Sequence, residues 1–243
     1  MKPVSLYIMS IKGIFPIHKW DFKSESILAD LPPIDFELLT RNKIEHPYKK
    51  GEVVFKEGSY PSGIFFINYG KVKKYRVDEQ GKEQIIYVAN KGELIGYHAI
   101  LSEDSYPDSA STLEVSNIAF IPKEDFLKAL EQSSILNHRL LKTLSHEFAV
   151  LANSLTLFSQ KSVRERLALH LIVIREKYKV NFQPGMEVEI NMSRDDLAGL
   201  VGTARENVVR VLSEFKKDGI LETKGRKIFV RDINKLISIA NYK

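Results

Sequence analysis

The 243-residue chain contains no cysteine. Disulfide bonds are therefore excluded, and so are thiolate-held iron–sulfur clusters and zinc sites with cysteine ligands. Long hydrophobic runs are also missing, because no stretch approaches the roughly 18 apolar residues of a membrane-spanning helix. The first residues show no secretory pattern, since Lys12, Pro16 and His18 interrupt their apolar side chains. These absences predict a cytoplasmic protein without a membrane partner.

Positive charge is concentrated in the last third of the chain. Residues 162–243 hold 16 lysines and arginines against 11 aspartates and glutamates, whereas residues 1–161 hold 20 charges of each sign. The whole net charge of +5 therefore lies in the later segment. A basic segment is typical of a surface that binds nucleic-acid phosphates.

Residues 190–221 predict two short helices joined by a tight turn at Gly202. Each helix starts with a hydroxyl residue three positions before an acidic one, the spacing of a capping box. The two pairs are Ser193 with Asp196 and Thr203 with Glu206. The second helix, which ends at Gly219, buries a stripe formed by Ala204, Val208, Val211, Leu212 and Phe215. Residues 219–231 then form two short strands around a glycine turn, a hairpin called the wing below.

The opposite face of the second helix carries residue types that read base edges. In a helix-turn-helix, arginine donates two hydrogen bonds to guanine in the major groove, and glutamate accepts from cytosine. Four residues are predicted to contact bases: Arg205, Glu206, Val209 and Arg210. Eight others are predicted to contact phosphates: Ser193, Arg194, Thr203, Ser213, Lys217, Lys224, Arg226 and Lys227. An ordinary helical hairpin with a solvated charged face is the alternative.

This arrangement resembles the winged helix-turn-helix of the Crp/Fnr family of bacterial transcription regulators, above all in the pattern Arg, Glu, three residues, Arg. The resemblance implies a TGTGA-like half-site, a palindromic operator in double-stranded DNA, and RNA polymerase as a further partner. Val209 departs from the family pattern, in which glycine or serine stands, and valine could pack against a thymine methyl group. The iron–sulfur cluster of the oxygen-sensing Fnr branch is excluded because cysteine is absent.

From about residue 44 to 122 the pattern changes to short apolar strands separated by glycine turns, which favours an antiparallel barrel or jelly roll. Residues 48–75 resemble the opening strands of a cyclic-nucleotide-binding domain. The predicted fold class is therefore α+β, in four parts. These are an N-terminal extension (1–25), a cyclic-nucleotide-binding-like jelly roll (26–132), a dimerisation helix with its hinge (133–160) and a winged helix-turn-helix domain (161–243).

The ligand pocket of that domain is altered. Family members that bind cAMP use a glutamate for the ribose and an arginine for the cyclic phosphate, where this chain has Tyr97 and Asp108. An aspartate reverses the sign of the dominant interaction with a phosphate. We therefore do not expect cAMP to bind in the family's manner; Tyr97 and its neighbours fill the pocket, or it holds an effector of unknown identity. The candidate pocket residues are Gly96, Tyr97, His98, Asp108 and Ser109.

A long helix is predicted from about residue 134 to Phe158, with a hinge at residues 159–161. Six of its apolar side chains follow the alternating 3-4 spacing of a coiled-coil seam. These seam residues are Leu141, Leu144, Phe148, Leu151, Leu155 and Phe158. The family resemblance implies a homodimer through this seam, so that two recognition helices read a symmetric operator. Packing of the stripe against the chain's own barrel is the alternative.

Two other functions stay open. A cupin-like metalloenzyme also uses a jelly roll, yet none of the six histidines forms an H-x-H pair or precedes an acidic residue at cupin spacing. His98 is the histidine considered as a haem or metal ligand. No Ser/His/Asp or paired-carboxylate pattern stands out, so no enzyme activity, metal site or cofactor is predicted. The other alternative is a cyclic-nucleotide regulatory subunit that acts on a partner protein, which the missing pocket arginine opposes.

Overall fold

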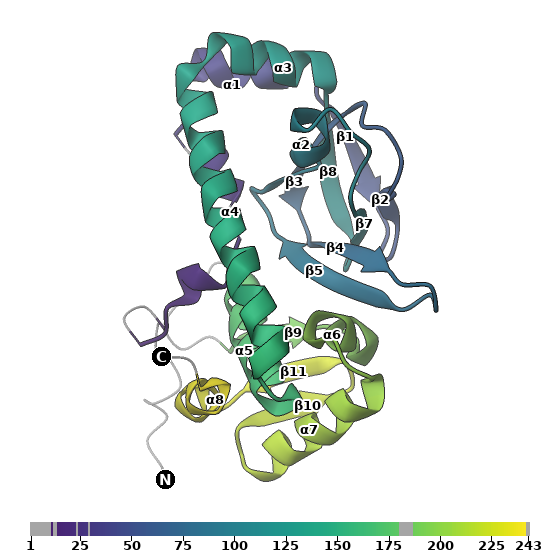
Figure 1. The fold of residues 1–243 in the computed structure, drawn as a ribbon, viewed down its shortest axis with the longest axis vertical. Coiled ribbons are helices and arrows are strands. Elements are labelled where there is room, and N and C mark those ends of the chain that lie inside the picture. Colours follow the sequence, from purple (N-terminus) through teal and green to yellow (C-terminus); the bar gives the residue numbers. More distant parts are fainter. Residues whose placement is uncertain (1–10, 12–13, 23, 29, 180–186, 242–243) are drawn as a thin grey trace. The chain divides into compact units, whose positions relative to one another are not determined.

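The structure is a computed structural model (Figure 1). The chain folds into two compact units. The N-terminal unit comprises residues 22–81 and 85–149, and the C-terminal unit combines residues 150–243 with the segments 1–21 and 82–84. The residues described are 11, 14–22, 24–28, 30–179 and 187–241. Within these ranges, no helix has both the length and the hydropathy needed to cross a bilayer.

Two four-stranded sheets make up most of the N-terminal unit, in the orders β1-β8-β3-β6 and β2-β7-β4-β5. The predicted antiparallel jelly roll is confirmed. Gly70 permits the turn between β3 and β4, because its φ is +97° and a Cβ atom there would lie 2.8 Å from the Cα of Ser116. The strands are β1 (Ile44–Tyr48), β2 (Val53–Phe55), β3 (Gly63–Tyr69), β4 (Val72–Val77), β5 (Glu83–Ala89), β6 (Leu94–Ile95), β7 (Ser109–Thr112) and β8 (Ser116–Pro122).

Short helices share a hydrophobic core with this sandwich. They are η3 (Ser24–Ile27), α1 (Pro33–Thr40), α2 (Tyr97–Leu101) and α3 (Lys123–Gln132). Helices α1 and α3 lie side by side (Figure 1). The core joins Ile64 of β3 and Phe126 of α3 to Leu136 and Leu140, which belong to the long helix α4 (Ser134–Gln160). Apolar burial therefore attaches the first half of α4 to the jelly roll.

Helix α4 presents different side chains on two faces. Its buried positions also follow 3-4 spacing: Leu136, Leu140, Thr143, Glu147 and Val150, with Leu157 further along. Most of the predicted seam lies on the other face, where Leu141, Phe148, Leu151, Leu155 and Phe158 are between 40 and 75% exposed. Leu144 instead packs against the core of the N-terminal unit. Packing of the whole seam on its own barrel is thus contradicted, and two predicted hinge residues, Ser159 and Gln160, belong to the helix.

In the described part of the C-terminal unit, α4 is followed by four helices and a three-stranded sheet in the order β10-β11-β9. Ser162 starts the first helix with a capping box, in which its Oγ accepts from the Glu165 N–H and its own N–H donates to the Glu165 carboxylate. The elements are α5 (Val163–Lys177), β9 (Glu189–Asn191), α6 (Arg194–Val201), α7 (Arg205–Lys217), β10 (Leu221–Lys224), β11 (Lys227–Val230) and α8 (Ile233–Ala240).

Part of the predicted N-terminal extension packs against the C-terminal unit. Around the short helix η2 (Ile17–Lys19), Phe15 and Trp20 are buried. The Oδ1 of Asp21 lies 3.0 Å from the Nζ of Lys177 in α5. This part of the extension is therefore a strap rather than a free arm, whereas residues 1–10 lie outside the described residues.

Candidate functional site

Helices α6 and α7 form the predicted helix-turn-helix in the C-terminal unit (Figure 1). The N-cap of helix α6 is Ser193, whose Oγ accepts a hydrogen bond from the Asp196 N–H at 3.0 Å. Its C-cap is Gly202, whose φ of +65° lies in the left-handed region that glycine adopts without a steric penalty. The chain reverses there and enters α7 three residues later.

The start of α7 differs from the prediction. Its N-cap is Ala204 rather than Thr203, so the predicted capping box between Thr203 and Glu206 does not form. Thr203 is buried, and its Oγ1 accepts a hydrogen bond from Asn207 at 3.1 Å. Ala204, predicted to be buried, is exposed. Ala204 provides no side-chain cap, so within the described residues the first N–H groups of α7, which form the positive end of the helix dipole, have no N-cap side chain as a partner.

The two faces of α7 have opposite character. The buried face consists of Val208, Val211, Leu212 and Phe215, none more than 3% exposed. The residues predicted to read bases lie outside this face and are all exposed: Arg205, Glu206, Val209 and Arg210. Ser213 and Lys217, which are predicted to contact phosphates, are exposed as well. The chain therefore presents the expected hydrogen-bonding groups to solvent.

Two carboxylates pair with the exposed arginines of α7. The Nε of Arg205 lies 3.7 Å from the Oδ1 of Asp195, and the Nη1 of Arg210 lies 2.7 Å from the Oε1 of Glu214. Neither carboxylate is among the functional residues predicted from the sequence. For Glu214 a local signal exists, because it follows Arg210 by four residues, the spacing at which side chains meet on a helix.

The wing is attached to the start of α6 by Arg194. Its Nη2 donates to the Gly225 carbonyl at 3.1 Å, and its Nη1 donates to the Arg226 carbonyl at 3.3 Å. Arg194 thus connects the tip of the wing to the helix-turn-helix, a role that the sequence analysis missed. At the tip, Lys224 and Arg226 are exposed, whereas the Nζ of Lys227 lies 2.9 Å from a Glu189 carboxylate oxygen.

Arg166 of α5 supports the turn between the two helices, and the sequence analysis missed it too. Its Nε donates to the Val201 carbonyl at 2.9 Å, and its Nη2 donates to the Gly202 carbonyl at 3.3 Å. These bonds satisfy carbonyl groups that the end of α6 leaves without helical partners. Burial, together with the positive charge of Arg166, lowers the pKa of the half-buried His170 to about 4, so this imidazole is neutral at pH 7.

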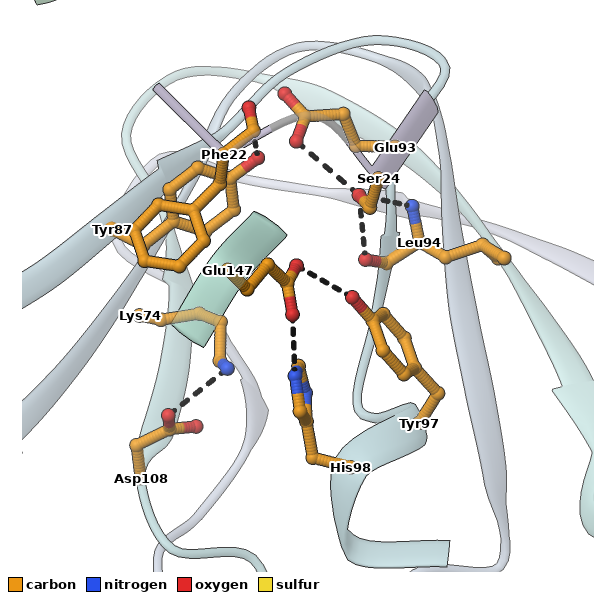
Figure 2. Close-up of polar contacts among 10 residues, drawn as sticks. All are labelled: Phe22, Ser24, Lys74, Tyr87, Glu93, Leu94, Tyr97, His98, Asp108 and Glu147. Atoms are coloured by element: carbon orange, nitrogen blue, oxygen red, sulfur yellow. Dashed lines mark hydrogen bonds and ion pairs between the residues drawn. The ribbon is translucent and has the colours of Figure 1, made fainter. Parts of the chain in front are cut away.

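The residues of the predicted effector pocket make hydrogen bonds and ion pairs with other residues of the protein (Figure 2). Tyr97 is 1% exposed, and its hydroxyl donates to the Oε1 of Glu147 on α4 at 2.6 Å. The Nε2 of His98 lies 2.7 Å from the other oxygen of the same carboxylate. Because an ionised carboxylate only accepts hydrogen bonds, this nitrogen carries a hydrogen. Glu147 therefore joins α2 to α4 through both of its oxygens.

Hydrogen bonds keep Glu147 ionised in this buried position. Burial acts to raise the pKa of Glu147, but the hydrogen bond and charge of His98, together with the hydrogen bond from Tyr97, hold it below the usual 4.5. Lys74 contributes in the same direction. Burial and the adjacent carboxylate raise the pKa of Tyr97 far above its usual value, so its hydroxyl remains a donor at physiological pH.

The other pocket positions are also engaged within the protein. Asp108 is 6% exposed, and its Oδ2 lies 3.0 Å from the Nζ of Lys74 on β4 (Figure 2). The Oγ of Ser109 accepts a hydrogen bond from the Glu57 N–H at 3.0 Å. Gly96, at a φ of +86°, starts α2. Where a cyclic phosphate would meet an arginine in the family, this chain thus has an internal lysine–aspartate pair.

Comparison with known families decides between the interpretations. A model of the cyclic nucleotide-binding domain matches residues 45–133, and a model of the Crp-like helix-turn-helix domain matches residues 165–239. The two matches occur in the order of the two predicted domains. The chain belongs to the Crp/Fnr family.

Named relatives agree with the Crp/Fnr assignment. The chain is 28% identical over 213 residues to the transcriptional activator protein anr of Pseudomonas aeruginosa, covering 88% of this chain and 85% of that protein. It is 29% identical over 196 residues to the fumarate and nitrate reduction regulatory protein of Escherichia coli, covering 81% and 78%. The solved structure of FixK2 from Bradyrhizobium japonicum shares the fold, with a TM-score of 0.71 and 21% identity over 83% of this chain and 98% of that one.

The Crp/Fnr membership identifies the chain as a DNA-binding transcription regulator and not an enzyme. This membership excludes the cupin-like metalloenzyme. It also excludes a regulatory subunit without a DNA-binding domain. Among the described residues, no three His, Asp or Glu side chains come together as metal ligands, and His98 instead contacts Glu147.

We predict that Tyr97→Phe lowers the free energy of unfolding by about 1–3 kcal/mol, because a buried carboxylate loses a charge-assisted hydrogen bond. Urea unfolding followed by circular dichroism measures the change. Tyr60→Phe is the matched control, since Tyr60 is 81% exposed and the same hydroxyl is removed at the surface. Equal effects of the two substitutions would contradict a stabilising role for the bond to Glu147.

Proposed function

We propose that this Crp/Fnr regulator binds a palindromic operator as a homodimer and reads each half-site with the exposed face of α7. The observation that carries the proposal is the division of α7 into two faces. Its apolar stripe is buried in the C-terminal unit, and two guanidinium groups with one carboxylate are exposed in its first two turns. Within a duplex, such a helix presents its N-terminal turns to the major groove.

Each base-reading residue has a proposed role. Arg205 and Arg210 donate pairs of hydrogen bonds to guanines, and Glu206 accepts from a cytosine amino group. On the family resemblance, these contacts correspond to a TGTGA-like half-site. Val209 contacts a thymine methyl group. We therefore expect any difference from the family's half-site to lie in its first bases. Its side chain is 47% exposed and can make this apolar contact.

Phosphate contacts position the helix on the duplex without reading sequence. We assign this role to Lys224 and Arg226 at the tip of the wing, and to Ser213 and Lys217 on α7, all of which are exposed. Lys227 joins them if DNA displaces its ion pair with Glu189. Ser193, Arg194 and Thr203 make hydrogen bonds within the protein, so their contacts with phosphate are secondary to that structural role.

Dimerisation occurs through the exposed seam residues of α4. Five apolar side chains on one helix face are 40 to 75% exposed in the single chain, which favours association with an identical face. A second copy is the occupant that the DNA-binding role requires, because a symmetric pair of recognition helices reads a symmetric operator. RNA polymerase is proposed as a further partner on the family resemblance alone.

The regulator does not respond to cAMP in the manner of its cAMP-binding relatives. Asp108 stands at the position of the phosphate-binding arginine and is paired with Lys74. Tyr97 stands at the position of the ribose-binding glutamate and bonds to Glu147. A cyclic nucleotide would have to break these buried interactions and place its phosphate beside a carboxylate.

The roles of the DNA-contacting residues predict two kinds of defect. Arg205→Ala and Arg210→Ala should each cost about 1–3 kcal/mol at one base pair and relax specificity there, because a bidentate contact is lost. Lys224→Ala and Arg226→Ala should weaken binding to all sequences and reduce the salt slope by about one. Fluorescence anisotropy with an operator selected from random DNA, and with random DNA, measures both. Equal losses on the two DNAs for Arg210→Ala would refute its base-reading role.

The seam predicts a dimer that a single charge disrupts. Phe148 is 75% exposed. The Phe148→Glu variant should be a monomer with strongly reduced operator affinity, because dimerisation would bury the new carboxylates. Sedimentation velocity measures the oligomeric state. Val115→Glu is the control, because Val115 is an exposed apolar residue outside α4. A monomeric wild type, or a dimeric Phe148→Glu variant, would rule out dimerisation through this face.

The internal partners of Tyr97 and Asp108 predict that isothermal titration with cAMP gives no saturable heat in the micromolar range. Operator affinity should likewise not change when cAMP is added. Saturable micromolar binding of cAMP to the purified protein would overturn this part of the proposal.

A further inference from the structure

Glu214 bridges two guanidinium groups that belong to different helices. Its Oε1 accepts a hydrogen bond from the Nη1 of Arg210 on α7 at 2.7 Å. Its Oε2 accepts one from the Nη1 of Arg164 on α5, also at 2.7 Å. The Glu214 carboxylate is therefore shared between an arginine that faces solvent on the DNA-reading helix and an arginine of the supporting helix.

Arg164 is itself held in place by α7 and by Asp218, the residue that caps the end of that helix. Its Nη2 donates to the Oδ2 of Asp218 at 3.1 Å, and its guanidinium carbon lies 4.7 Å from the centroid of the Phe215 ring. Phe215 is fully buried, so the ring beneath the guanidinium is fixed. With two carboxylates and one aromatic face as partners, Arg164 gives Glu214 a fixed position rather than a mobile one.

This anchoring distinguishes the pair Arg210–Glu214 from an ordinary surface ion pair. An isolated pair four residues apart on a helix is weak, because two flexible side chains must be ordered for one exposed contact. Here Arg164 holds the same carboxylate through a second ion pair, whose two side chains are 36% and 39% exposed, so Arg210 meets an acceptor that another guanidinium already restrains. The guanidinium group has five N–H donors, and the bond to Glu214 uses one, which leaves donors free for a base.

We propose that Glu214, anchored by Arg164, is a positioning residue that sharpens base discrimination by Arg210. The inference rests on the proposed function, in which Arg210 reads a base. An arginine that is restrained before binding loses less conformational entropy when it contacts the correct base, and it has fewer alternative rotamers with which to contact a wrong one.

Glu214 has a second effect, on the affinity for DNA of any sequence, and this effect is unfavourable to binding. The two effects together make the proposal testable. A carboxylate on the DNA-facing helix repels phosphates, so its removal should strengthen binding to DNA of any sequence. Loss of positioning should instead weaken discrimination at a single base pair. The expected signature of Glu214→Ala is therefore tighter binding to random DNA together with poorer discrimination at the base pair that Arg210 reads.

The experiment uses the full-length protein and the operator selected from random DNA. The base pair read by Arg210 is first identified as the one at which Arg210→Ala loses discrimination among the four possible base pairs. Glu214→Ala should reduce discrimination at that base pair by about 3- to 10-fold, a fraction of what a complete bidentate contact supplies. Discrimination at the base pair read by Arg205 should change by less than about twofold.

Three further variants separate positioning from charge and from folding. Glu214→Gln removes the same charge but keeps an acceptor for Arg210, so it should retain more discrimination than Glu214→Ala. Glu222→Ala is the matched control, because Glu222 is an exposed carboxylate of the same unit that pairs with Arg231 at 2.8 Å, and it should leave discrimination unchanged. In an Arg210→Ala background, Glu214→Ala should cause no further loss at that base pair.

Several results would overturn the inference. In one, Glu214→Ala discriminates among base pairs as well as the wild type does, while Arg210→Ala loses that discrimination. This result shows that Arg210 reads its base without help from Glu214. An equal loss at every base pair, or equal effects of the Gln and Ala variants, shows a structural or purely electrostatic role. If Arg210→Ala itself loses discrimination at no single base pair, the proposed base-reading role fails, and the inference fails with it.

Discussion

The rotation of α7 about its own axis is the constraint on which the DNA-binding surface depends. Four apolar side chains fix that rotation: Val208, Val211, Leu212 and Phe215. Each contributes about 1.5–3 kcal/mol by leaving water, so rotating the helix by half a turn would forfeit most of the burial. Arg205 and Arg210 point outward because these four residues point inward. Hydrophobic burial within the unit thus determines which polar groups are offered to a duplex.

Elements with a strong local pattern were predictable from the sequence. The stripe of α7, the glycine reversal at Gly202 and the two strands of the wing all depend on spacing within a few residues. The structure contains each of them, except that Ala204 lies outside the buried stripe. The exact start of α7 was not predictable in the same way. Thr203 and Ala204 are adjacent, and the burial of Thr203 with its bond to Asn207 moves the N-cap by one residue. A capping pattern alone carries no information about that burial.

Contacts between residues far apart in the chain left no signal in the sequence. Tyr97 and Glu147 are separated by 50 positions, as are Arg164 and Glu214. The family resemblance indicated that the pocket lacks its arginine, but it could not show that Lys74 would pair with the replacing aspartate. The same holds for the face of α4 that carries Glu147, because a carboxylate within an apolar stripe looks like an interruption until its partners are known. The candidate site was therefore predictable in its exposed residues and not in those that hold them.

The tether between Arg194 and the wing is made to main-chain carbonyl oxygens rather than to side chains. Such a bond does not depend on which side chains stand at the tip, apart from Gly225, whose φ of +59° favours glycine. Substitutions at Arg226 and its neighbours can thus alter the charge of the tip while the distance from the wing to the reading helix is retained. During evolution, descendants of this protein could tune their general attraction to chromosomal DNA without disturbing the frame that aligns the reading helix with its operator.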